Sequence, residues 1–207
     1  MILDRRLAGI GAIAFSVLFV VAFFAASPPG GNYHVNDVTD FVAKDHRNAV
    51  IASIFLMLVS LVGLLLATAY LSETSFEKGQ VARLAWGTSL LAALAFLAGW
   101  AVVLAPATSL TVGGGPGIDP TVTYTIMQAG FGVIFATGAM FFGVSLLALA
   151  LAGRSAPMWL RWFSGLVGVL SIFSLAFFPF YAVILWGVVV GIWLLASSPK
   201  QAASAVA

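Results

Sequence analysis

The sequence predicts an all-α integral membrane protein, a bundle of six transmembrane helices arranged as three hairpins, with both termini in the cytoplasm. Two observations predict this fold class. Of the 207 residues, 62% are hydrophobic and only 8% are charged, whereas about a quarter are charged in ordinary soluble domains. The apolar residues also form long blocks, which indicates that lipid rather than water surrounds much of the surface.

Six apolar blocks are long enough, or nearly so, to cross a hydrocarbon core of about 30 Å, which takes roughly 20 helical residues. They are residues 7–26, 49–71, 84–105, 123–152, 162–178 and 180–197. The blocks lack the alternation of barrel strands, so all six are expected to be helices. Together they form a single membrane domain, residues 1–199, and residues 200–207 are expected to be a disordered tail.

The first block follows Arg5 and Arg6 and looks superficially like a signal peptide. Its apolar run of about 20 residues is longer than the usual signal core, so we expect a retained first span. Before the second block, Val38, Phe41 and Val42 share one helical face, and Asp37 is a plausible N-cap. This pattern predicts a short amphipathic helix on the outer surface.

The fourth block is too long to lie wholly in hydrocarbon, so its first turn is expected in the interface, or the helix tilts. Only Pro179 separates the fifth block from the sixth. The two form either a tight outer hairpin or one long kinked helix. One helix of about 36 residues would be about 54 Å long, well over one bilayer, so the hairpin is favoured.

The distribution of Lys and Arg sets the orientation. The hairpin arrangement places seven of them on one side: Arg5, Arg6, Lys78, Arg83, Arg154, Arg161 and Lys200. The other side carries two, Lys44 and Arg47. The positive-inside rule therefore places both termini in the cytoplasm.

None of the six blocks contains Asp, Glu, Lys, Arg or His, and the chain has no cysteine. Proton-driven pumps and intramembrane proteases usually need ionisable groups at membrane depth, so both classes are disfavoured. Haem held between spans by two histidines is excluded, because both histidines lie in one outer loop. We therefore expect no cofactor, no resident metal and no catalytic residue. The few positive charges form no basic run, so no nucleic-acid partner is expected.

Neutral polar residues are the candidates for a ligand pocket or pore. Gln128 is the first of these, because an amide in hydrocarbon needs a partner more than a hydroxyl does. The other candidates are Thr137, Ser89 and Ser60. The competing interpretation, which we favour, is that such hydroxyls bond their own or a neighbouring helix. The GxxxG formed by Gly187 and Gly191 predicts close helix packing, within the chain or between copies.

The first outer loop holds a polar cluster: His34, Asp37, Asp45, His46 and Arg47. Imidazole and carboxylate groups can bind a divalent metal. The wide gap between the two histidines matches no metal motif, so solvated surface residues are the favoured interpretation.

Three short segments carry a resemblance to known proteins: residues 41–48 (FVAKDHRN), 155–160 (SAPMWL) and 185–186 (LW). They resemble segments of uncharacterised actinobacterial multispanning membrane proteins, which form a bacterial domain family of unknown function. The resemblance runs from about residue 41 to 195. It implies a six-helix protein of the bacterial cytoplasmic membrane, and it implies no activity and no catalytic residues.

Three functions follow as hypotheses. The first is a protein that binds a lipid or small apolar molecule, or an accessory subunit of a membrane complex, with lipids, a second copy or another membrane protein as partners. The second is a transporter or channel for a neutral or hydrophobic solute, lined by Gln128 and the hydroxyls. The third is a metal-dependent enzyme at the outer surface, using the His34 and His46 cluster.

Overall fold

The computed structural model describes residues 4–29, 31–43, 47–76, 79–112, 119–174 and 180–197, and every regular element in these ranges is a helix. The elements are α1 (Arg5–Ala26), α2 (Val35–Phe41), α3 (Arg47–Ser75), α4 (Gln80–Val112), α5 (Pro120–Gly132), the π-helix η2 (Val133–Gly138), α6 (Ala139–Ala152), α7 (Met158–Ile172) and α8 (Phe180–Ala196). The helices α5, η2 and α6 form one continuous rod. Within the described ranges, four helices are long and apolar enough to cross a membrane: α1, α3, α4 and this rod.

Local signals set where two of the long helices begin. The Asp4 carboxylate accepts a hydrogen bond from the Arg6 amide at 3.0 Å and caps α1. The Asp119 carboxylate accepts from the Thr121 amide at 2.8 Å and caps α5, with Pro120 in the first turn. An N-cap aspartate followed by proline is a strong helix start, so α5 begins before the expected residue 123.

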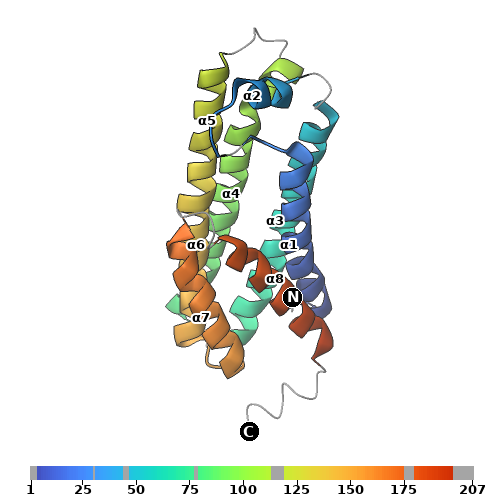
Figure 1. Cartoon of the computed structure of the whole chain (residues 1–207). Coiled ribbons are helices and arrows are strands. Elements are labelled where there is room, and N and C mark those ends of the chain that lie inside the picture. The colour runs from blue at the N-terminus through green and yellow to red at the C-terminus, as the bar shows by residue number, and fades with distance from the viewer. Residues whose placement is uncertain are drawn as a thin grey trace.

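Helices α3, α4 and the rod run the length of the bundle and α1 runs most of it, whereas α7 and α8 occupy only its lower half (Figure 1). Phe180, the first residue of α8, shows how far α8 reaches. Its ring centroid lies 5.3 Å from that of Phe19, 5.9 Å from that of Phe96 and 5.1 Å from that of Phe135. These three residues lie towards the middle of α1, α4 and the rod, so α8 starts at mid-height.

The other end of α8 lies at the bottom of the bundle. The Arg5 Nε donates to the Leu194 carbonyl at 2.8 Å, and the Trp193 ring lies 5.8 Å from that of Trp159 in the first turn of α7. Helix α7 rises from this level, and Ser174, just after its end, donates to the Phe135 carbonyl at mid-height. The described end of α7 and the first residue of α8 therefore both lie half-way up the bundle.

This geometry differs from the two full spans expected at residues 162–178 and 180–197. Helices of 15 and 17 residues are about 22 and 25 Å long, less than a hydrocarbon core of about 30 Å. The expected turn at Pro179 lies outside the described residues. Its described neighbours Ser174 and Phe180 lie inside the bundle rather than at its upper end.

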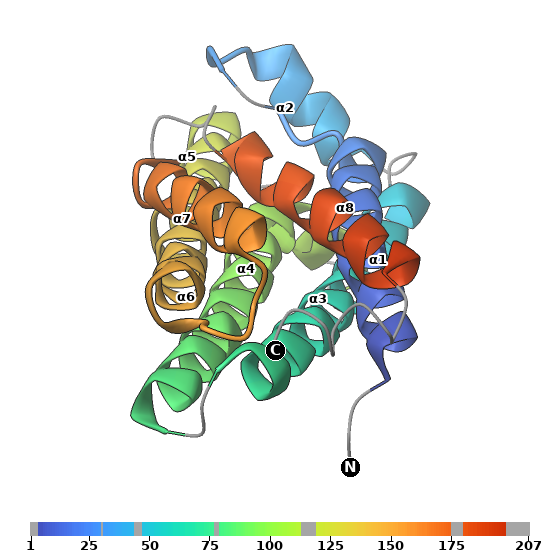
Figure 2. The ribbon, with the colours of Figure 1, turned by 90° about the horizontal axis from the view of Figure 1, so that it is seen from below.

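The number of helices around the bundle consequently changes with height. In the lower half, α1, α3, α4, α6, α7 and α8 form a closed ring, each packing on the next (Figure 2). Among the described residues, the upper half contains α1, α3, α4 and α5 as its long helices. No described part of α7 or α8 occupies the position between α1 and the rod at that level, so the described helices leave the upper half open on that side.

The short amphipathic helix expected before the second span is present as α2. Val38 and Phe41 are buried, and α2 packs against α5. Asp37, however, is not the N-cap. His34 takes the extended conformation that precedes the helix, so the helix begins three residues earlier than expected and Asp37 lies in its first turn. At this position its negative carboxylate interacts favourably with the positive end of the helix dipole.

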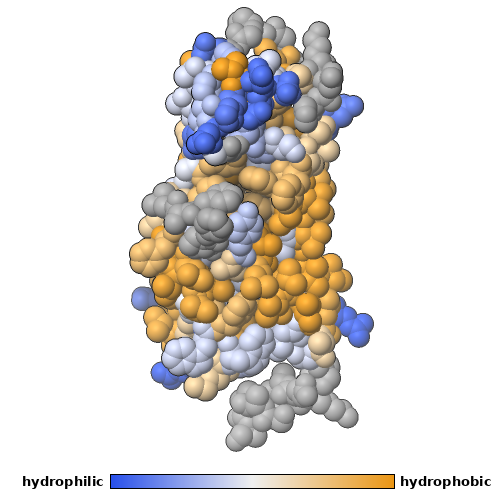
Figure 3. Space-filling view, viewed as in Figure 1, coloured by the Kyte–Doolittle hydropathy of each residue, from blue (hydrophilic) through white to orange (hydrophobic). Residues whose placement is uncertain are grey.

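The surface has a broad apolar zone with polar residues gathered at the α2 end (Figure 3). Large apolar side chains are exposed on every long helix, for example Phe24 on α1, Phe55 on α3 and Leu94 on α4. Soluble monomers rarely expose contiguous apolar surface of this extent. The surface of the described part of the chain is therefore consistent with a membrane protein.

Candidate apolar binding cleft

A cleft of about 130 Å³ lies on the open side of the upper half, directly above the start of α8. It is lined by residues from the upper part of α1, from η2 and from the first turns of α8: Phe19, Val20, Phe23, Phe24, Ile134, Phe135, Phe180, Tyr181 and Ile184. The cleft lies above the described ends of α7 and α8, where apolar side chains of α1 and η2 have no described helix beside them.

The wall formed by η2 depends on the irregular backbone of the rod. In a π-helix, i→i−5 hydrogen bonds replace the regular i→i−4 hydrogen bonds of the backbone. A backbone carbonyl at such a change of pattern can then accept a hydrogen bond from another partner. The Ser174 hydroxyl supplies such a bond by donating to the Phe135 carbonyl. At the end of η2, Gly138 lets Phe96 approach, since a Cβ there would lie 2.5 Å from the Phe96 ring. These contacts fix η2 and hold Phe135 at the cleft.

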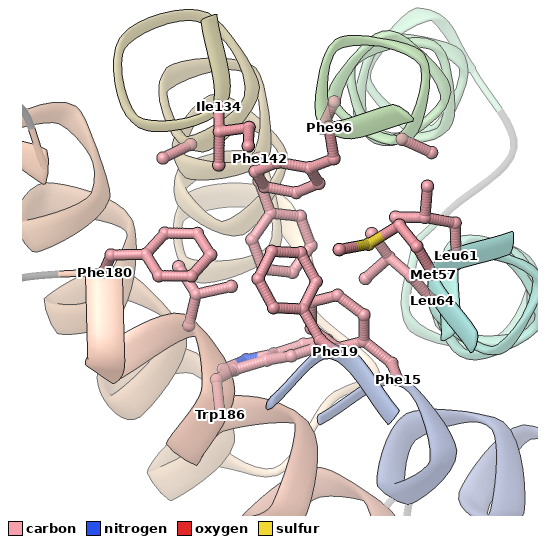
Figure 4. Close-up of a cluster of buried hydrophobic side chains, with 14 of the residues drawn as sticks. Phe15, Phe19, Met57, Leu61, Leu64, Phe96, Ile134, Phe142, Phe180 and Trp186 are labelled. Carbon is pink, nitrogen blue, oxygen red and sulfur yellow. The ribbon is translucent and has the colours of Figure 1, made fainter. Parts of the chain in front are cut away.

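A packed aromatic layer forms the floor of the cleft (Figure 4). Below Phe180, the Phe142 ring lies 6.4 Å from that of Phe15 and 5.2 Å from that of Trp186, and all three side chains are fully buried. The Trp186 indole donates to the Ser164 hydroxyl at 3.0 Å, which fixes its orientation. This layer closes the cleft towards the lower half of the bundle.

The chemistry of the lining is simple. The described lining residues carry no carboxylate, imidazole, ammonium or guanidinium group, and their polar part is limited to the backbone and the Tyr181 hydroxyl. Such a lining has no group that transfers protons near neutral pH or binds a metal. It offers aromatic and branched aliphatic surface, so what it can do is hold an apolar chain or ring.

The structure does not bring the four neutral polar candidates together. Ser60 on α3 is buried and donates to the Phe15 carbonyl at 2.8 Å. Ser89 on α4 is buried and lies 2.7 Å from the Ser145 hydroxyl of α6. Gln128 is half-buried on α5, and Thr137 is exposed on η2. None of the four lines the cleft, and the two serines serve contacts between helices.

The polar cluster of the first outer loop is only partly described. His34 and Asp37 are exposed at the start of α2. Asp45, His46 and the side chain of Arg47 lie outside the described residues, so their part in a metal site stays untested. Among the residues that are described, no three His, Asp or Glu side chains lie close enough to hold a metal ion.

Gly187 and Gly191 are used for packing within the chain. A Cβ on Gly187 would lie 2.9 Å from the Ala12 carbonyl oxygen, and one on Gly191 would lie 2.8 Å from that of Gly9. Both distances are shorter than real Cβ contacts, so α8 lies directly on the backbone of α1. Three further glycine pairs make equivalent contacts elsewhere: Gly11–Gly63, Gly99–Gly130 and Gly143–Gly168.

The aromatic residues of the cleft were not among the candidates from the sequence. A search for polar or ionisable side chains passes over Phe19, Phe135 and Phe180, because phenylalanine in an apolar block looks like ordinary core. The available signal was the aromatic run Phe177-Phe178-Pro179-Phe180-Tyr181, which marks the boundary between two helices.

Comparison with family models, curated proteins and solved structures finds no match for this chain. The resemblance to actinobacterial membrane proteins therefore stays a prediction. The assignment of a function rests on the geometry of the cleft alone.

Proposed function

We propose that the chain is a multi-pass protein of a bacterial cytoplasmic membrane with both termini in the cytoplasm. In this proposal α1, α3, α4 and the rod cross the bilayer, while α7 and α8 form a re-entrant hairpin that enters from the cytoplasmic side and turns back part-way. This hairpin takes the place of the last two full spans in the six-span prediction. It leaves the positive-inside argument unchanged, since a re-entrant hairpin also returns the chain to the side of Arg5.

We propose further that the protein binds the acyl chain of a lipid, or another small apolar molecule, in the cleft above the hairpin. The observation that carries this proposal is an aromatic cleft of about 130 Å³ with no charged lining. An apolar cavity of about 150 Å³ is large enough for a benzene-sized group. The open side faces the bilayer in the proposed orientation, so a chain can enter laterally without crossing water.

Shape rather than hydrophobicity must select such a ligand. Lipid tails are as apolar as the cleft, so moving a chain from bilayer to protein gains little from the hydrophobic effect. The gain comes from close contacts, each worth about 0.1–0.2 kcal/mol, which an unfilled cleft forfeits. Rigid rings held by Phe180 and η2 provide such contacts without rearrangement.

Photocrosslinking with a phospholipid that carries a diazirine in its acyl chain tests this proposal. We expect labelled peptides to come mainly from α1, η2 and the start of α8. Val20→Trp should fill the cleft and lower this labelling about tenfold, since a bulky ring removes the space. Val21→Trp is the matched control, because Val21 is exposed on the same helix and does not line the cleft. Labelling spread evenly over the apolar surface, or equal in both variants, would count against a specific site.

One observation favours transport of a neutral solute as a second candidate. Helices α7 and α8 end at mid-height, next to the irregular η2, and transporters often build their sites where helices are interrupted in this way. Flux of neutral solutes into liposomes measures this activity. If transport runs through the cleft, Val20→Trp should block flux and Gln128→Leu should leave it unchanged. The opposite pattern would favour the lining expected from the sequence.

A further inference from the structure

A second groove lies at the lower end of the bundle, between α6 and α7, on a different face from the cleft. Its volume is about 550 Å³, and its lining is apolar except for one charged side chain, that of Arg161. Leu151, Met158 and Trp162 line it and are 80%, 70% and 71% exposed. In the proposed orientation this groove opens into the inner leaflet, with the tryptophan at the level where indole rings favour the interface.

The guanidinium of Arg161 is fixed at the mouth of the groove. Its Nε donates to the Ala150 carbonyl at 3.0 Å and its Nη2 approaches the Leu151 carbonyl at 3.5 Å. These carbonyls belong to the last turn of α6, where the backbone carbonyls of a helix have no amide donor within the helix. The contacts hold the side chain in one place while leaving the Nη1 donors unused.

The positive charge of Arg161 is not neutralised by the part of the chain that the structure describes. No described carboxylate forms an ion pair with it, and the connection between α6 and α7 contains no acidic residue. This half-buried guanidinium is oriented, carries an uncompensated charge and lies beside apolar surface. The arrangement is complementary to a phospholipid, in which an anionic phosphate lies next to a hydrocarbon chain. Arginine binds phosphate oxygens with paired, charge-assisted hydrogen bonds.

We propose that this groove binds an anionic phospholipid of the inner leaflet. The phosphate accepts hydrogen bonds from the Arg161 guanidinium, and one acyl chain lies along the apolar groove towards Leu166 and Val169. The proposal rests on the proposed membrane orientation but not on ligand binding in the cleft. Basic pockets between helices on the cytoplasmic side are a known form of lipid recognition.

Native mass spectrometry of the full-length protein in detergent tests the proposal, using equal amounts of phosphatidylglycerol and phosphatidylcholine with identical acyl chains. We expect the wild-type protein to retain phosphatidylglycerol preferentially, by about fivefold, because the choline cation of phosphatidylcholine compensates its own phosphate and is repelled by Arg161, whereas the net charge of phosphatidylglycerol is uncompensated. Arg161→Gln should abolish this preference. Arg83→Gln should keep it, because Arg83 is exposed on the same predicted side but lies outside the groove.

A second variant separates loss of the site from loss of the fold, because Arg161→Gln also frees the carbonyls of α6. Val169→Trp fills the groove and leaves Arg161 in place, so it should lower retention of both lipids while the thermal unfolding temperature changes little. Soluble glycerol phosphate in excess should not compete, because it lacks the chain. A wild type without preference, a preference that survives Arg161→Gln, competition by glycerol phosphate, or a lipid-free dimer with the groove buried would each overturn the proposal. Photocrosslinking at the cleft reports on the other site independently.

Discussion

At the scale of single residues, hydroxyl groups join neighbouring helices inside an otherwise apolar interior. The Ser16 hydroxyl of α1 donates to the Ile184 carbonyl of α8 at 2.7 Å. The Ser60 hydroxyl of α3 donates to the Phe15 carbonyl of α1, and that of Ser145 on α6 to the Ala85 carbonyl of α4. Each bond joins two helices that are distant in sequence, so these serines contribute to the arrangement of the bundle.

The Ser16→Ala variant measures this contribution. The loss of the bond to α8 should lower the free energy of unfolding by about 0.6 kcal/mol, and by no more than about 1.7 kcal/mol. Thr74→Ala is the control, since the Thr74 hydroxyl is exposed and bonds only the Tyr70 carbonyl of its own helix. Equilibrium unfolding in mixed micelles gives both values. Equal effects of the two variants would show that the bond between helices adds nothing.

At the scale of elements, close backbone approach at glycine positions determines how the helices pack. Helix α1 uses opposite faces for this purpose: Gly11 lies against Gly63 of α3, and Gly9 lies against Gly191 of α8. Small residues at such contacts allow the van der Waals packing that drives association in lipid, where the hydrophobic effect between helices is absent. The position of α8, and hence the floor of the cleft, depends on this contact.

Gly191→Ala tests the contact between α1 and α8. The new Cβ would lie 2.5 Å from the Ile13 side chain and 2.8 Å from the Gly9 carbonyl oxygen, so we expect a loss of about 1–3 kcal/mol in unfolding free energy. Gly87→Ala is the matched control in an open position, where alanine should stabilise the helix by up to about 1 kcal/mol. Thermal unfolding in detergent compares them. A neutral Gly191→Ala would mean that α8 does not pack this closely.

The helices also show which features of the fold the sequence can predict and which it cannot. Hydropathy located all the long helices, because a helix in lipid must be apolar over its length. It missed the first turn of α5, since Asp119 and Pro120 form a polar start outside the apolar block. It placed α7 at residues 162–178 instead of Met158–Ile172, and it placed α8 almost as observed. It did not predict how high the two helices reach in the bundle, because Phe180 is equally apolar whether it lies inside the bundle or at its surface.

At the scale of the whole molecule, the cleft results from the limited height of α7 and α8 in the bundle. No local sequence pattern indicates this height. Among the described residues, six helices surround the lower half and four long helices surround the upper half, so apolar side chains of α1 and η2 are left exposed at one place. Composition defines each helix but not its height relative to the others, which depends on contacts such as those of Phe180. From the sequence alone, the residues that line the cleft could therefore not be distinguished from ordinary core residues.

The height of the hairpin is the central claim, and cysteine accessibility tests it most directly because the chain has no cysteine of its own. Single cysteines are placed at Thr39 on α2, at Phe173 at the end of α7 and at Ser197 after α8, and cells are treated with a membrane-impermeant thiol reagent before and after permeabilisation. We expect Thr39→Cys to react from outside, Ser197→Cys only after permeabilisation, and Phe173→Cys, exposed on the protein surface but within the bilayer, in neither case. Reaction of Phe173→Cys from outside would show that the hairpin crosses the membrane completely, and reaction of Ser197→Cys from outside would contradict the topology itself.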